Sequence, residues 1–390
     1  MAEKKSLFSF PTEVHMGRDA AKVLPEAAAR FGNKAILLTS RRQFQDSDII
    51  EKVSQSLTAK NFNVLVYDEI GLEADSKECD EIASLAKSSR CEFVIGLGGD
   101  VVLNGAKAVA LLCSNPGETS DYLTEQDGYR LNIARAPIPS IMIPTAFGTL
   151  CETTPGFVIK DHADGIRKKL YNSRVLPSCA IIDPQMTRSV SRKYLSASGL
   201  LVLALAIELY LSPEANVVSD GFVQKTLELV NGYLVALNRD PDNMDLRGQL
   251  MNASLLLSYG ASCCPLGPIY ALMEAITSRA TVYKGSLASV LLPQFMEYNL
   301  TASPGRYVQI VRLLGEDVST ISVLEAAIKA VERVRLYVEE FNIPTRLGDL
   351  DVKRTDLEDI SQIFFRFEES RNNTRPIGPD DLRVIVDQSM

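Results

Sequence analysis

The chain has 390 residues, 46% of them hydrophobic and 23% charged, with a formal net charge of −8. This length and apolar content predict a globular protein of two domains, each with a large core. The charge is spread along the sequence without a basic cluster, which argues against nucleic acid or an anionic membrane as the main partner.

The N-terminus and the cysteines predict a cytoplasmic protein. MAEKKSLFSF has no long apolar core behind its two lysines, so it does not have the pattern of a secretory signal. The apolar run at residues 200–207 is too short to span a bilayer. Seven cysteines, an odd number without regular spacing, are typical of reduced thiols.

The first half of the chain alternates short apolar or β-branched runs with amphipathic stretches. This order predicts a parallel sheet with helices on both faces. The expected strands lie at residues 34–40, 63–70, 92–98, 140–145 and 179–184.

Long helical periods follow in the second half, at residues 221–238, 245–259 and 323–341. The predicted organisation is therefore an α/β domain at residues 1–185 and an all-α domain at residues 186–390. Ligands of such proteins usually bind in the cleft between the domains, which is where we expect the active-site region.

A glycine cluster lies between an expected strand and an expected helix. Gly96, Gly98 and Gly99 occupy the position where backbone N–H groups and a helix N-terminus bind a diphosphate. Asp100 follows them directly. We expect its carboxylate to cap the helix at residues 101–112, in the place where a phosphate would otherwise lie.

The sequence contains GLGGDVVLNGAK at residues 96–107 and ASGLLVLALAIELY at residues 197–210. Together with five further segments, they resemble the iron-containing (group III) alcohol dehydrogenases of the dehydroquinate synthase-like superfamily. This resemblance implies an N-terminal Rossmann-like domain, a C-terminal helical domain, at least a dimer, a dinucleotide cofactor and a divalent cation. Lys107, Thr145 and Thr149 match residues of that family's dinucleotide site. The segments are FSFPTEVHMG, GLGGDVVLNGAK, PTAFGTLCETT, ASGLLVLALAIELY, VLLPQFMEYN, IPTRL and NNTRPI.

The resemblance also shows departures around the dinucleotide. Asp100 stands at the third consecutive glycine of the family's GxGGGSxxDxAK loop, and Leu150 replaces a further glycine. A diphosphate about 4 Å from a carboxylate would be repelled by roughly 4 kcal/mol per unit charge at an effective dielectric of 20. Ser40 stands where members that prefer NAD tend to carry an aspartate. With Arg41 and Arg42 beside it, this position suits the 2′-phosphate of NADP, unless the arginines are simply solvated.

The family's metal ligands are absent at the matching positions. Its helix ASGxDAxxHAxExY becomes ASGLLVLALAIELY, which puts Leu201 and Leu205 at the two ligands. By the same resemblance, the two ligating histidines become Tyr270 and Lys284, and Glu274 replaces a third histidine near the substrate. Leucine has no donor atom and an ammonium has no lone pair, so we expect no metal here.

Tyr270 and Lys284 allow two interpretations. An ammonium beside a phenol stabilises the phenolate, so the pair could act as proton donor to a carbonyl oxygen in place of the metal. Alternatively, Lys284 pairs with Glu274 and Tyr270 fills the space left by the ion. We favour the second interpretation, because the ligands are lost together with changes in the phosphate loop.

Two functions follow from these alternatives. The first is a non-catalytic structural, regulatory or partner subunit, as a homo-oligomer or in a hetero-oligomer with an intact dehydrogenase. The second is a metal-independent carbonyl reductase or alcohol dehydrogenase that uses NADP or NAD with Tyr270, Lys284 and Glu274. Other, non-redox chemistry on a small molecule in the same cleft stays open.

Overall fold

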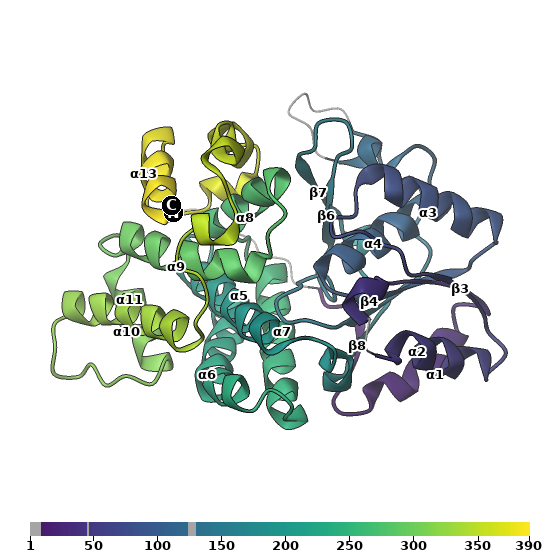
Figure 1. Cartoon of the computed structure of the whole chain (residues 1–390), viewed down its shortest axis with the longest axis horizontal. Coiled ribbons are helices and arrows are strands. Elements are labelled where there is room, and N and C mark those ends of the chain that lie inside the picture. The colour runs from purple at the N-terminus through teal and green to yellow at the C-terminus, as the bar shows by residue number, and fades with distance from the viewer. Residues whose placement is uncertain (1–8, 45–46, 124–129) are drawn as a thin grey trace. The chain divides into compact units, whose positions relative to one another are not determined.

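The computed structural model describes residues 9–44, 47–123 and 130–390 (Figure 1). It forms two compact units, one at Phe10–Val190 and one that contains Ser191–Met390. The first is built on a parallel sheet and the second is helical, so the predicted fold class is confirmed.

The α/β unit contains a six-stranded parallel sheet with the strand order β1-β8-β5-β4-β2-β3. The central strands β4 and β5 are buried along their whole length, as expected for a sheet covered on both faces. A separate antiparallel hairpin is formed by β6 and β7. The bounds are β1 (Glu13–Met16), β2 (Lys34–Leu38), β3 (Asn63–Tyr67), β4 (Phe93–Gly98), β5 (Ser140–Pro144), β6 (Gly156–Lys160), β7 (Arg167–Tyr171) and β8 (Cys179–Ile182).

Helices cover both faces of this sheet because successive strand residues point to opposite sides. In β2, Ile36 packs in the core beneath α3 and α4, whereas Leu37 packs in the core beneath α1 and α2. Figure 1 shows these two helix pairs on opposite sides of the strands. The helices are α1 (Leu24–Ala29), α2 (Ile49–Thr58), α3 (Ser76–Ser88) and α4 (Asp100–Ser114), with short 3-10 helices at Ala20–Val23, Arg41–Phe44, Thr119–Tyr122, Ser173–Val175 and Pro184–Thr187.

The helical unit is built around α5, which packs against α6, α7, α8 and α9. By length and composition α5 could cross a membrane, but 94% of its most apolar window is buried, as expected of a central core helix. The helices are α5 (Arg192–Leu211), α6 (Val217–Arg239), α7 (Met244–Cys263), α8 (Pro268–Arg279), α9 (Lys284–Asn299), α10 (Pro304–Leu313), α11 (Val323–Glu340), α12 (Ile360–Phe364) and α13 (Pro379–Ser389), with 3-10 helices at Gly348–Leu350, Arg354–Leu357 and Glu368–Arg371.

The segment at residues 8–17 contributes an edge strand. Its described part, from Ser9 onward, contains one strand, β1. This strand pairs in parallel with β8, a partner more than 160 residues further along the chain. Phe8 lies outside the described residues.

Candidate functional site

The glycine turn lies at the carboxyl end of β4, in the centre of the sheet. A Cβ atom at Gly96 would lie 2.9 Å from the Cβ of Ala106, and one at Gly98 would lie 2.7 Å from the Cβ of Val102. Both distances are too short for real side chains. These two glycines are therefore required for α4 to pack closely on the strand that precedes it.

Asp100 does not cap α4 as we predicted. The helix begins at Asp100, and the extended residue Gly99 is its N-cap, with no hydrogen bond from a cap side chain. A capping side chain must come from the non-helical residue before the first turn, and Asp100 already belongs to that turn. Gly99 has no side chain to cap the first-turn N–H groups of α4, and the Asp100 carboxylate adds negative charge beside them.

Lys107 is almost completely buried on the inner face of α4. Its Nζ donates hydrogen bonds of 2.8 Å to the backbone oxygens of both Thr154 and Gly156. Burial lowers the pKa of this ammonium to about 8. Lys107, predicted to bind cofactor, therefore holds the start of β6 against α4.

The loop after β5 contains the other matching residues. The Thr145 N–H donates to the Gly98 oxygen at 3.0 Å, which joins this loop to the glycine turn. The Thr149 hydroxyl donates to a carboxylate oxygen of buried Glu152 at 2.5 Å. Leu150 has a φ of 57°, in the left-handed region that costs a residue with a Cβ about 1–2 kcal/mol. The loop thus keeps a backbone suited to glycine while carrying a buried leucine.

A pocket of about 1140 Å³ lies beyond the end of β2 in the α/β unit. Ser40 lines it, but its hydroxyl donates to the Ile70 oxygen at 2.8 Å, and Arg41 forms an ion pair with Asp68. Arg42 and Arg188 also line the pocket, and no ion pair is found for either within the described residues. Of the predicted Ser40, Arg41 and Arg42 group, only Arg42 therefore has a charge available for a ligand phosphate.

In the helical unit, Lys284 and Glu274 form an ion pair. The Lys284 Nζ lies 2.6 Å from Glu274 Oε1, and the two side chains are 13% and 0% exposed. Tyr270 precedes Glu274 by one turn of α8, and the Lys284 Nζ lies 5.9 Å from its ring centroid. The three predicted catalytic residues therefore lie together, with Tyr270 and Lys284 at the starts of α8 and α9 and Glu274 in the middle of α8.

Leu201 and Leu205 lie on α5, in the same helical unit as Tyr270, Glu274 and Lys284. Ala197, Leu201, Leu205 and Glu208 are spaced three or four residues apart, so they share one face of α5. At one end of this face, a Cβ atom at Gly285 of α9 would approach the Ala197 oxygen to 2.5 Å. At its other end, Glu208 contacts the start of α8. Both leucines are buried between these points.

Glu208 is a buried residue whose role we missed in the sequence, although it matches the family's helix motif. Its carboxylate accepts hydrogen bonds from the N–H groups of Gly267, Ile269 and Tyr270, at the N-terminus of α8. Burial raises its pKa to about 7, against the opposing effect of these donors. The carboxylate fixes α8, and with it Tyr270, on α5.

A parallel sheet with a glycine turn before α4, followed by an all-helical domain, defines a nucleotide-binding-type two-domain fold. Residues 11–184 match the iron-containing alcohol dehydrogenase family, and residues 195–390 match the C-terminal domain of the Fe-containing alcohol dehydrogenase family. The chain therefore belongs to the iron-containing alcohol dehydrogenase family.

Relatives match the chain along nearly its full length. The NAD-dependent methanol dehydrogenase of Bacillus methanolicus is 24% identical over 383 residues, which cover 98% of this chain and 99% of the relative. The crystal structure of a 1,3-propanediol oxidoreductase is similar with a TM-score of 0.93 at 23% identity, covering 99% of this chain and 100% of that one. Sulfoacetaldehyde reductase from Bifidobacterium kashiwanohense, solved with NAD+, is similar with a TM-score of 0.85 at 23% identity and 99% coverage of both chains.

Proposed function

We propose that this protein is a metal-independent oxidoreductase of the family, which reduces a carbonyl compound to an alcohol with NADPH or NADH. The observation that carries the proposal is the arrangement of Tyr270, Lys284 and Glu274: a phenol beside an ammonium that a buried carboxylate holds in place. The curated relatives support an oxidoreductase, since their names are those of alcohol dehydrogenases and an aldehyde reductase.

The residues at the family's metal position do not fit iron or zinc. Leu201 and Leu205 offer no donor atom, and the ammonium of Lys284 is bonded to Glu274. Of the four positions, Tyr270 is the one that still offers a donor atom, its hydroxyl oxygen. We infer that this member has lost its metal site, and no step of the proposed reaction uses a metal.

A dinucleotide fits the α/β unit better than the sequence suggested. The N-cap residue of α4 is Gly99, which has no side chain, and the N-terminus of a helix attracts a diphosphate. Arg42 and Arg188, in the pocket beyond β2, suit a 2′-phosphate. When bound, the nicotinamide supplies the hydride.

The chain's own residues provide the proton. Glu274 is fully buried, and its carboxylate holds the Lys284 ammonium in place at 2.6 Å. The Lys284 Nζ lies 5.9 Å from the Tyr270 ring centroid, so its positive charge stabilises the negative charge that develops on the phenol as the tyrosine gives its proton to the carbonyl oxygen of the substrate. Tyr270 is therefore the proton donor, and Lys284 and Glu274 position it and assist the transfer.

The test is the reduction of short aldehydes with NADPH and NADH. Tyr270→Phe is expected to lower kcat about 100-fold or more with little change in Tm, because only the proton donor is lost. Tyr233→Phe, a half-buried tyrosine on α6, is the matched control and should leave the rate unchanged. Full activity in Tyr270→Phe would rule out its role as proton donor.

A non-catalytic subunit is the second candidate. It is favoured by Asp100 at the start of α4 and by the strained Leu150, both of which disfavour a bound diphosphate. On this alternative, the protein forms a homodimer or a hetero-oligomer with an intact dehydrogenase in the cytoplasm, where its seven free cysteines stay reduced. Calorimetry without NADPH or NADH binding, together with no aldehyde turnover, would support it.

A further inference from the structure

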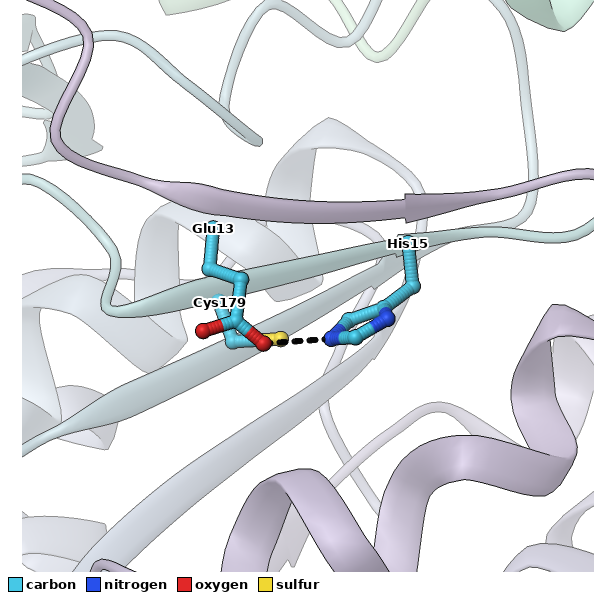
Figure 2. Close-up of side chains that lie close together, drawn as sticks. All are labelled: Glu13, His15 and Cys179. Atoms are coloured by element: carbon cyan, nitrogen blue, oxygen red, sulfur yellow. Dashed lines mark hydrogen bonds and ion pairs between the residues drawn. The ribbon is translucent and has the colours of Figure 1, made fainter.

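A second polar cluster lies at the edge of the parallel sheet, and it involves none of the residues discussed so far. Glu13 and His15 are two residues apart on β1, so their side chains point to the same face. Glu13 pairs in register with Cys179 of β8. Figure 2 shows the three side chains converging from the two neighbouring strands.

The distances are compatible with a common ligand. One donor atom from each residue lies within 4.8 Å of the others, and the His15 Nε2 lies 2.6 Å from Glu13 Oε1. Zinc bonds of about 2.0–2.3 Å place the donor atoms of a tetrahedral site roughly 3.3–3.8 Å apart. No separation in the cluster exceeds 4.8 Å, so the donor atoms have to close by at most about 1 Å, and the His15–Glu13 pair has to open by about 0.7 Å. Side-chain rotation can provide both movements.

We propose that Glu13, His15 and Cys179 bind one zinc ion, with water as the fourth ligand. A carboxylate oxygen, an imidazole nitrogen and a thiolate sulfur form a donor set that zinc accepts and that magnesium and calcium do not favour. This site belongs to the α/β unit and shares no residue with the family's metal position.

The surroundings of the cluster fix each ligand. Arg30 bonds to Glu13 Oε2 at 2.5 Å, which leaves Oε1 facing His15. The thiol of Cys179 lies at the buried end, and burial raises its pKa to about 11. Zinc binding must therefore displace the thiol proton, whereas the partly exposed Glu13 and His15 leave an entry side for the ion.

The ion would have a structural role. β1 is an edge strand of only four residues, and β8 is its only neighbour in the sheet of the described chain. A zinc ion shared by both strands would link two segments that are far apart in the sequence. Loss of the ion should then loosen the edge of the sheet.

Cobalt titration of the full-length protein tests the proposal, because thiolate-bound Co²⁺ gives an intense near-ultraviolet charge-transfer band and tetrahedral Co²⁺ gives visible bands. We expect both bands to saturate at one equivalent and to disappear when Zn²⁺ is added. Cys179→Ser should remove the charge-transfer band, and His15→Ala should weaken Zn²⁺ affinity at least about tenfold.

Two control variants use the same residue types elsewhere in the chain. His162→Ala removes the only other histidine, and Cys113→Ser removes a partly exposed thiol on α4. Both should leave binding unchanged. Because Cys179 is buried and its replacement could disturb folding, Glu13→Gln on the exposed side gives a second test and should also weaken binding.

Two results would overturn the proposal. Wild-type protein that shows no cobalt bands, or bands that persist with one equivalent in a folded Cys179→Ser variant, would exclude the site. These readings are independent of reductase activity. Tyr270→Phe should bind zinc as the wild type does.

Discussion

At the scale of single residues, Lys284 and Glu274 form an ion pair that is almost completely buried in the helical unit. Glu274 has no exposed surface, and its carboxylate lies 2.6 Å from the ammonium of Lys284. An isolated buried carboxylate is strongly disfavoured. The pair is therefore needed for stability whether or not Tyr270 is catalytic.

We predict that Lys284→Met alone lowers the free energy of unfolding by about 3–5 kcal/mol, because it strands the buried carboxylate of Glu274. Glu274→Leu alone should cause a similar loss. The double variant should recover much of it, since no unpaired charge remains. Urea unfolding of the three variants measures this cycle.

The exposed pair of Lys225 and Glu228 on α6 is the matched control. Its atoms are 3.0 Å apart, but both side chains are about half exposed. Breaking it should change the free energy of unfolding by at most about 1 kcal/mol. An equally small effect of Lys284→Met would contradict the buried-pair account.

The sequence predicted the partners of some site residues but not of others. Lys284 and Glu274 are ten residues apart and were expected to pair. The bond from Ser40 to the Ile70 oxygen was missed because Ile70 lies thirty residues further on. The cluster of Glu13, His15 and Cys179 was missed for the same reason, since it depends on the register of β1 against β8.

At the scale of elements, the start of α4 decides how well a diphosphate can bind. The helix dipole and the N–H groups of the first turn attract an anion, whereas the Asp100 carboxylate in the same turn repels it. The charge of Asp100 therefore decides how strongly the start of α4 attracts a diphosphate. Asparagine removes this charge without changing the size of the side chain.

Asp100→Asn is expected to raise NADPH affinity about tenfold or more, because it removes the repulsion between the carboxylate and the diphosphate. It should cost less than about 1 kcal/mol of stability, since only the dipole interaction of an N-terminal acid is lost. Calorimetric titration measures the affinity. Asp242→Asn, at an exposed site before α7, makes the same change in net charge and should have no effect. Unchanged or weaker binding in Asp100→Asn would show that the carboxylate does not oppose the cofactor.

Strands and long helices were the elements that the sequence predicted best. The five expected strands appear as β2, β3, β4, β5 and β8, and the expected helices correspond to α6, α7 and α11, the last of which ends one residue earlier than expected, at Glu340. β-branched runs and helical periods are strong local signals. The capping of α4 failed because it depends on a shift of one residue, between Gly99 and Asp100, which composition does not determine.

At the scale of the whole molecule, stability should depend on the pH through buried carboxylates. Glu208 links α5 to the N-terminus of α8, and burial raises its pKa from an ordinary 4.5 to about 7. The folded protein therefore keeps Glu208 protonated at pH values at which the unfolded chain has released this proton. Between these two pH values, the folded protein binds more protons than the unfolded protein does.

Glu208 therefore stabilises the folded protein most below about pH 4.5, and this stabilisation is lost as the pH rises to about 7. The loss amounts to about 3 kcal/mol in the free energy of unfolding. Glu208→Gln cannot titrate, so its stability should fall less steeply than that of the wild type over this range. Urea unfolding at several pH values compares the slopes. Glu332→Gln, an exposed carboxylate on α11, should keep the wild-type slope. Equal slopes for Glu208→Gln and the wild type would mean that the three N–H donors of α8, which favour the charged carboxylate, outweigh its burial.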